Sequence, residues 1–207
     1  MKNDYPVIAE NDRGGTRITY GIVGGTSHIV FIKTGRGGTI FRENDDQPDV
    51  YPDLAGRIRE RFGYTVIVAD NPLGENRPDP LIDDMGFLNQ YAEESRLRDV
   101  VADYVGFSAG ADYGAWYGHL FPVIRRMLLI NPIVNLNPHR MKDCCDRFSG
   151  EEISFLFGES DPSARYAFLI PTRGNVCCEK MTGQGHLPDP ELFIAKVLEF
   201  LNRPKPS

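Results

Sequence analysis

The strongest constraint on this chain is a serine flanked by small residues, in the sequence Gly-Phe-Ser-Ala-Gly at residues 106–110. The apolar residues 100–105 lead into this pentapeptide, and residues 111–119, which can form a helix, follow it. A serine at a sharp turn from a strand into a helix requires small neighbours, because larger ones prevent the backbone from bending tightly. The pattern alone is common in ordinary turns. The strand before it and the helix after it favour a nucleophile elbow that exposes Ser108.

The composition of the 207-residue chain is that of an ordinary globular protein, with 41% hydrophobic and 25% charged residues. We expect one domain over residues 1–207, with residues 1–15 as an N-terminal extension and residues 203–207 as a tail. The formal net charge of −6 disfavours non-specific binding to nucleic acid, which needs a basic surface. No apolar run reaches the roughly 18–20 residues of a membrane span, and residues 1–12 lack the apolar stretch of a signal peptide. These features predict a cytoplasmic protein with neither a nucleic-acid nor a membrane partner, and they leave the oligomeric state open.

The four cysteines form two adjacent pairs, at residues 144–145 and 177–178. Neighbouring cysteines bridge each other only with strain, and neither pair has the Cys-x-x-Cys spacing of zinc sites. We therefore expect buried or incidental thiols. The sequence also contains no cluster of metal ligands, no dinucleotide fingerprint and no phosphate-binding loop, so we expect no cofactor and no metal.

Short β-rich runs alternate with helical patterns along the chain. Strands are expected at residues 16–23, 28–34, 64–69, 100–105, 126–131, 153–157 and 175–180, and helices at residues 52–62, 85–98, 111–119 and 190–201. We expect the first two strands to form a hairpin or to lie side by side, and residues 134–152 are too irregular to assign. This alternation predicts an α/β fold with a mostly parallel sheet and helices on both faces. Ligands bind at the carboxyl ends of the strands in such sheets, and Ser108 follows a strand at that edge.

A serine hydroxyl needs a neighbouring base to act as a nucleophile, and histidine is the natural base. His186 is the favoured candidate, because it lies in a Gly-rich loop between the last expected strand and the last helix. The other three histidines lie in less suitable places, namely a strand, a helix end and an irregular stretch: His28, His119 and His139.

The histidine in turn needs an acid that orients it, and that acid should follow a strand between the serine and the histidine. Asp161 is the first choice, and Glu159 in the same loop is the near alternative. Asp161 followed by Pro162 also fits the start of a helix, with Asp161 as the N-cap. Two further candidates, Asp143 and Asp146, rank lower.

The oxyanion that forms during acyl transfer needs two hydrogen-bond donors that are already in place. The backbone N–H of Ala109, directly after the nucleophile, is the expected first donor. The second is expected from the Gly-rich loop at residues 35–38, where Arg36 is the first choice and Gly37 the second. These glycines also fit a tight turn that needs positive φ angles.

Taken together, these motifs resemble the α/β-hydrolase family over nearly the whole chain, from about residue 16 to residue 201. The order Ser108, Asp161, His186 is similar to the order in that family. The resemblance implies a three-layer α/β/α sandwich with a mostly parallel sheet. Thr34 stands where the family often has histidine before the first glycine of the oxyanion loop. Residues 132–152 are too short for a full cap domain, which implies little or no cap over the site.

The resemblance implies a serine hydrolase that cleaves a carboxylic ester or related acyl bond of a small molecule. Ser108, Asp161 and His186 would act through an acyl-enzyme, with Ala109, Arg36 and Gly37 as the oxyanion-hole candidates. A non-catalytic ligand-binding protein on the same scaffold is one alternative, and an acyltransferase or thioesterase is another.

Two further features are expected to be structural. The acidic residues 73–84 should form a solvated surface loop, and the aromatic pair Trp116 and Tyr117 should belong to the core.

Overall fold

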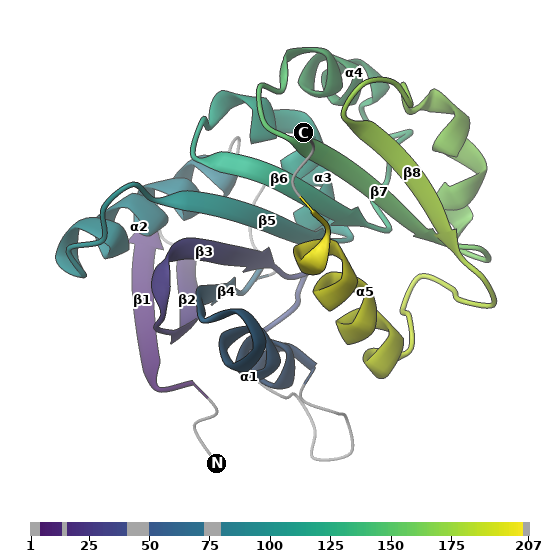
Figure 1. Ribbon diagram of the computed structural model, residues 1–207. Coiled ribbons are helices and arrows are strands. Elements are labelled where there is room, and N and C mark those ends of the chain that lie inside the picture. Colours follow the sequence, from purple (N-terminus) through teal and green to yellow (C-terminus); the bar gives the residue numbers. More distant parts are fainter. Residues whose placement is uncertain (1–4, 14–15, 41–49, 73–79, 205–207) are drawn as a thin grey trace.

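The computed structural model describes residues 5–13, 16–40, 50–72 and 80–204. Its centre is an eight-stranded sheet in the order β1-β2-β4-β3-β5-β6-β7-β8 (Figure 1). The strands are β1 (Val7–Arg13), β2 (Thr16–Val23), β3 (Thr26–Lys33), β4 (Tyr64–Ala69), β5 (Val101–Phe107), β6 (Ile124–Ile130), β7 (Glu152–Gly158) and β8 (Val176–Met181). β1 and β2 pair in antiparallel fashion with their neighbours, and β4, β3, β5, β6, β7 and β8 run parallel.

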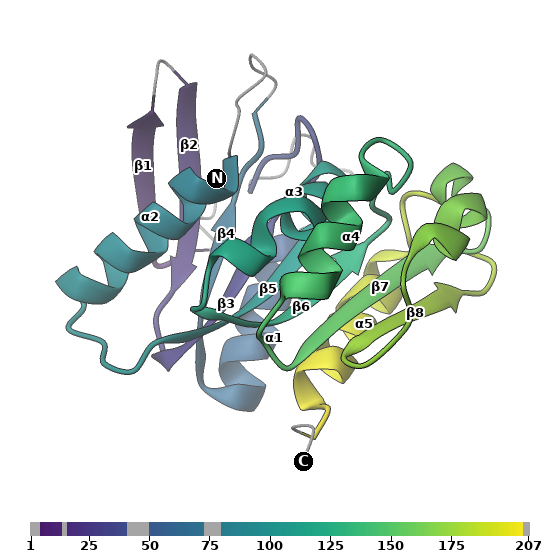
Figure 2. The same ribbon diagram turned by 90° about the horizontal axis from the view of Figure 1, so that it is seen from above.

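Helices cover both faces of the sheet, as Figure 2 shows from above. α1 (Val50–Phe62) and α5 (Pro190–Asn202) lie on one face, while α2 (Pro80–Glu94), α3 (Ala109–Tyr117) and α4 (Pro138–Arg147) lie on the other. Two 3₁₀ helices, η1 (Gly118–Leu120) and η2 (Pro162–Leu169), complete the elements. The predicted three-layer sandwich with a mostly parallel sheet is therefore confirmed. No helix in the described ranges is long and apolar enough to cross a lipid bilayer.

The central strands are apolar on both sides because both of their faces are covered. In β3, Ile29 and Phe31 join the core under α2 and α3, whereas Val30 and Ile32 join the core under α1 and α5. Continuous apolar runs of this kind are typical of parallel strands that carry helices on each side.

The expectation that the first two strands pair with each other is wrong, because β4 lies between β2 and β3. Thr65 at the start of β4 accepts a hydrogen bond from the Gly25 N–H (2.9 Å) and donates one to the Thr26 carbonyl (2.7 Å). The Gly-rich turn thus carries the chain across β4 rather than into a hairpin. β1 lies in the expected N-terminal extension and is an edge strand that pairs on one side only. Its polar sequence did not indicate a strand, because an edge strand tolerates polar residues.

The unassigned stretch between β6 and β7 contains α4. Asn137 caps this helix by accepting a hydrogen bond from the Arg140 N–H (3.2 Å), and Pro138 occupies the first turn. The helix buries Met141 and the Cys144–Cys145 pair, and it packs beside α3 (Figure 2). α4 therefore extends a helical layer of the sandwich, in agreement with the expected lack of a full cap.

Two glycines allow α3 to begin directly against the sheet. A Cβ atom at Gly106 would lie 2.6 Å from the Ala111 Cα atom, and one at Gly110 would overlap the Lys33 carbonyl oxygen. Lys33 pairs with Gly106 in the register of β3 and β5. The ends of these two strands and the first turn of α3 are therefore in backbone contact.

Because of this close contact, substitution by alanine should be far more destabilising at Gly110 than at a helical glycine with open space around its Cβ position. We expect Gly110→Ala to destabilise the fold by at least about 2 kcal/mol, because backbone atoms that cannot move away face the new methyl group. Gly56→Ala, in the exposed middle of α1 with nothing within 4 Å of its Cβ, should stabilise by roughly 0.5–1 kcal/mol. Urea unfolding of both variants measures these changes. Equal effects of the two substitutions would contradict the close approach of α3.

Candidate active site

Ser108 lies at a sharp turn between β5 and α3. Its backbone adopts φ 51° and ψ −118°, and non-glycine residues rarely have a positive φ of this kind. The Ser108 N–H donates to the Ile130 carbonyl (2.8 Å), and the Ser108 carbonyl accepts from the Asp112 N–H (3.0 Å). A backbone of this kind costs of order 1–3 kcal/mol and persists only where the surroundings enforce it. The turn presents the Ser108 side chain at the carboxyl edge of the sheet.

Three side chains predicted from the sequence are joined by hydrogen bonds at this edge. Ser108 Oγ lies 3.0 Å from His186 Nε2, and His186 Nδ1 lies 2.5 Å from Asp161 Oδ2. The Asp161 side chain is fully buried, whereas 40% of the His186 side chain is exposed. An ionised Asp161 can only accept, so His186 carries its proton on Nδ1 and its lone pair on Nε2. In this tautomer Nε2 can accept the proton of the Ser108 hydroxyl.

Asp161 fills both roles that its sequence context suggests. It caps η2, because its Oδ1 atom accepts a hydrogen bond from the Ser163 N–H (2.6 Å), while Oδ2 faces His186. The alternative acid, Glu159, is exposed and accepts a hydrogen bond from the Gly183 N–H (2.9 Å) in the loop after β8.

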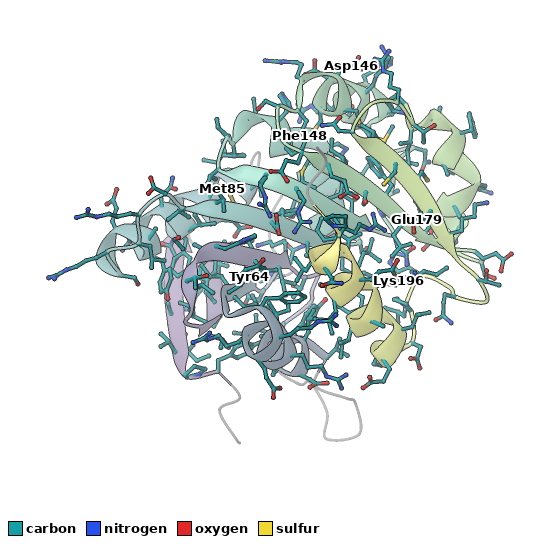
Figure 3. The ribbon with its side chains drawn as sticks, in the orientation of Figure 1. Tyr64, Met85, Asp146, Phe148, Glu179 and Lys196 are labelled. Atoms are coloured by element: carbon teal, nitrogen blue, oxygen red, sulfur yellow. The ribbon has the colours of Figure 1, made fainter. Side chains whose placement is uncertain are left out.

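The lower-ranked acids lie on α4 and form surface ion pairs. Asp143 pairs with Arg147 (3.2 Å), and Asp146 pairs with Arg173. Figure 3 shows Asp146 on the outer side of α4. Neither carboxylate is among the partners of His186.

The other three histidines lie away from Ser108. His28 contacts Asp103 (2.9 Å) near the start of β3, at the amino edge of the parallel strands. His119 lies in η1, 3.7 Å from Asp143, and His139 is exposed in the first turn of α4. Of the four, His186 is therefore the histidine placed to act as a base on Ser108.

The Gly-rich loop after β3 lies against the elbow. A Cβ atom at Gly35 would be 3.4 Å from the Ser108 Cβ atom. The Gly37 N–H donates to the Asn71 carbonyl (2.7 Å), and this bond argues against Gly37 as an oxyanion donor. Within the part of the chain that the structure describes, the N–H groups of Arg36 and Ala109 have no acceptor. The arrangement therefore favours the first-choice pair, Arg36 and Ala109.

Asn71 supports this loop, a role that the sequence did not suggest. Its N–H donates to the Gly38 carbonyl (2.8 Å) and its side-chain amide donates to the Thr34 carbonyl (3.3 Å). The Thr34 hydroxyl, at the position where the family often has histidine, donates to the Gly38 carbonyl (3.0 Å). The only sequence signal for Asn71 was its place two residues after a strand and directly before a proline.

A buried ion pair forms at the end of β3, just before the same loop. Lys33 Nζ is 3.0 Å from Asp84 Oδ2 and donates to the Asp70 carbonyl (2.8 Å), and the Tyr20 hydroxyl donates to Asp84 (3.2 Å). Asp84 was expected in a solvated acidic loop, and this expectation is wrong for Asp84, which is fully buried. Residues 73–79 of that loop lie outside the described part of the chain.

Asp112 in the first turn of α3 is another buried carboxyl near the elbow. Burial raises the pKa of this carboxyl to about 7, and the hydrogen bond that it accepts from the Ile133 N–H (2.6 Å) offsets part of that rise. The bond ties the segment after β6 to α3, the helix that follows Ser108.

One of the two cysteine pairs and the aromatic pair pack with the core. Cys144 and Cys145 are free and buried, and burial raises the pKa of each thiol to about 12. Trp116 and Tyr117 pack, partly buried, against the core under α3. Within the described ranges, no three His, Cys, Asp or Glu side chains are grouped as metal ligands would be.

No protein-family model and no curated protein sequence matches the chain, whereas solved structures match it over nearly its full length. A protein of unknown function from Agrobacterium tumefaciens has a TM-score of 0.72 at 16% identity, covering 97% of this chain and 100% of its own. An α/β serine hydrolase homologue from Coxiella burnetii has a TM-score of 0.66 at 15% identity, covering 95% and 96%. An esterase from Pyrococcus furiosus has a TM-score of 0.67 at 14% identity, covering 97% and 93%. The chain has the α/β-hydrolase fold. At these identities the likeness concerns the fold alone.

The different environments of Asp161 and Glu159 predict different effects of neutralising them. Asp161→Asn should slow labelling of Ser108 by a fluorophosphonate probe by roughly 10³–10⁴-fold, because the amide favours the wrong tautomer of His186. Glu159→Gln should change the labelling rate less than about threefold. Gel-based labelling time courses on the two folded variants measure both rates. Equal losses in the two variants would refute the assignment of Asp161.

Proposed function

We propose that this protein is a serine hydrolase of the α/β-hydrolase family that cleaves a carboxylic ester or related acyl bond of a small molecule. The observation that carries the proposal is the continuous hydrogen-bonded series Ser108, His186, Asp161 at the carboxyl edge of the sheet. The fold alone would not suffice, because one fold supports many functions.

In the first half of the reaction, Ser108 Oγ attacks the acyl carbonyl while His186 Nε2 takes its proton. Asp161 keeps the imidazole in the required tautomer and stabilises the imidazolium that forms. The buried position of Asp161 strengthens this interaction, because little water competes for its carboxylate.

The tetrahedral intermediate carries a negative oxygen that the N–H groups of Ala109 and Arg36 receive. When the intermediate collapses, His186 returns its proton to the leaving alcohol, and Ser108 stays acylated. A water molecule, activated by the same histidine, then releases the acid and restores the serine. Every step uses residues of this chain.

The surroundings of the site support a substrate with an apolar part. Leu187, directly after His186, is 77% exposed, and Ile133, whose N–H is held by Asp112, is 37% exposed. Leu136 is also exposed and lies in the same turn, where its N–H donates to the Ile133 carbonyl (3.0 Å). Solvent-facing apolar side chains on loops at this edge favour the acyl or alcohol group of an ester over a highly charged substrate.

Removing the nucleophile tests the proposal. Ser108→Ala should lower kcat/KM for short p-nitrophenyl esters by roughly 10⁴–10⁶-fold without loss of thermal stability, because the proposed acyl-enzyme forms on the Ser108 hydroxyl. Ser160→Ala, at an exposed serine in the acid loop, is the matched control and should keep wild-type activity.

Other outcomes of this experiment separate the alternatives. A folded wild-type protein that hydrolyses no ester and takes up no fluorophosphonate would support a non-catalytic binding protein. Turnover that passes the acyl group to added alcohols or amines in preference to water would identify an acyltransferase. Unchanged hydrolysis by Ser108→Ala would overturn the assignment of the nucleophile.

A further inference from the structure

Asn131, directly after β6, is a fully buried polar residue to which the sequence assigned no role. Its backbone has φ 51°, a left-handed conformation that asparagine, aspartate and glycine tolerate best. The preceding carbonyl, that of Ile130, accepts the hydrogen bond from the Ser108 N–H (2.8 Å). Asn131 is therefore one residue away from the backbone atom that holds the elbow.

The side-chain amide of Asn131 uses all of its hydrogen-bonding groups in contacts with two other loops. Oδ1 accepts from the Gly158 N–H (2.7 Å), and Nδ2 donates to the carbonyls of Gly185 (3.2 Å) and His186 (2.7 Å). The chemistry of these partners fixes the orientation of the amide, because a backbone N–H must face its oxygen and carbonyls must face its nitrogen.

The two loops that Asn131 holds in this way carry Asp161 and His186, the hydrogen-bonded partners that follow Ser108. Gly158 ends β7, and its carbonyl accepts from the Asp161 N–H (3.0 Å). The His186 carbonyl belongs to the histidine whose ring reaches Ser108. One side chain thus links the end of β6, the loop of the acid and the loop of the base.

We propose that Asn131 is a positioning residue that sets the distance and direction of the His186 ring relative to Ser108 and Asp161. The proposal rests on the proposed function, because positioning matters only if His186 moves a proton. Asn131 faces backbone atoms and is fully buried, so it acts through His186. Misplacement of a reacting group by about 1 Å can cost on the order of 10²-fold in rate, which makes this anchor kinetically important.

The backbone of Asn131 dictates which variants test this role. Alanine would add strain at φ 51°, whereas glycine removes the amide and tolerates the conformation. Asn131→Asp is nearly isosteric, keeps an acceptor for the Gly158 N–H, and as a carboxylate loses both donors to the histidine loop. The pair therefore separates loss of the whole anchor from loss of its bonds to the base.

Asn175→Ala is the matched control. The Asn175 amide donates to the Gly150 carbonyl (2.8 Å), a bond of the same kind, at the start of β8 on the amino edge of the sheet. Loss of this bond should lower thermal stability while leaving turnover unchanged. Any activity loss that merely follows reduced stability would appear in this variant as well.

The experiment measures kcat and KM for a short p-nitrophenyl ester, the rate of fluorophosphonate labelling, and the melting temperature. We expect Asn131→Gly and Asn131→Asp to lower kcat and the labelling rate by roughly 10–100-fold, with KM changed less than about threefold. Should Asn131→Gly fail to fold, the isosteric Asn131→Asp decides the question.

Two negative results are distinguishable. An active wild type together with folded Asn131 variants whose kcat and labelling rates stay within about threefold would overturn the positioning role and leave the proposed function intact. A wild type without esterase activity or labelling at Ser108 would overturn the proposed function itself.

Discussion

The arrangement of this molecule depends on the tight backbone turn at Ser108. The turn is possible because Gly106 and Gly110 let the first turn of α3 touch the ends of β3 and β5. The hydrogen bond from the Ser108 N–H to the Ile130 carbonyl ties the same turn to β6. Backbone strain of order 1–3 kcal/mol at Ser108 is thus maintained by contacts with three strands. These contacts fix the position from which the serine side chain projects.

Buried polar side chains extend this control from the elbow to the surrounding loops. Asn71 holds the Gly-rich loop, the Lys33–Asp84 pair lies at the end of the strand before that loop, and Asn131 links the loops of the acid and the base. Buried polar groups are costly unless they are paired, so satisfied groups specify one loop arrangement and penalise others. These buried side chains therefore preorganise the loops that carry the residues proposed to react.

The sequence predicted which three side chains the structure brings together at the end of β5, but it did not predict the full strand order of the sheet. Ser108, Asp161 and His186 could be found because each lies in a local pattern at the end of an expected strand, and a parallel sheet brings such ends to one edge. The pairing of β2 with β4 could not be found in the same way, because it depends on contacts between residues more than 40 positions apart. β1 was hidden by its polar composition, which an edge strand tolerates.

The supporting residues were missed for a related reason. Asn71 and Asn131 each follow a strand and precede a proline, a context that a simple turn explains equally well. Their roles come from partners elsewhere in the chain, such as Gly158 and His186 for Asn131. The choice between Arg36 and Gly37 likewise depended on one hydrogen bond to Asn71, which local sequence does not specify.

The central claim is that Ser108 becomes covalently acylated during turnover. Rapid acid quenching of the wild-type protein during hydrolysis of p-nitrophenyl acetate, followed by peptide mass spectrometry, tests this claim most directly. We predict an acetyl group on the peptide that contains residues 106–110, with Ser108 as the modified residue. Turnover without an acylated peptide, or acetylation confined to another residue, would contradict the account.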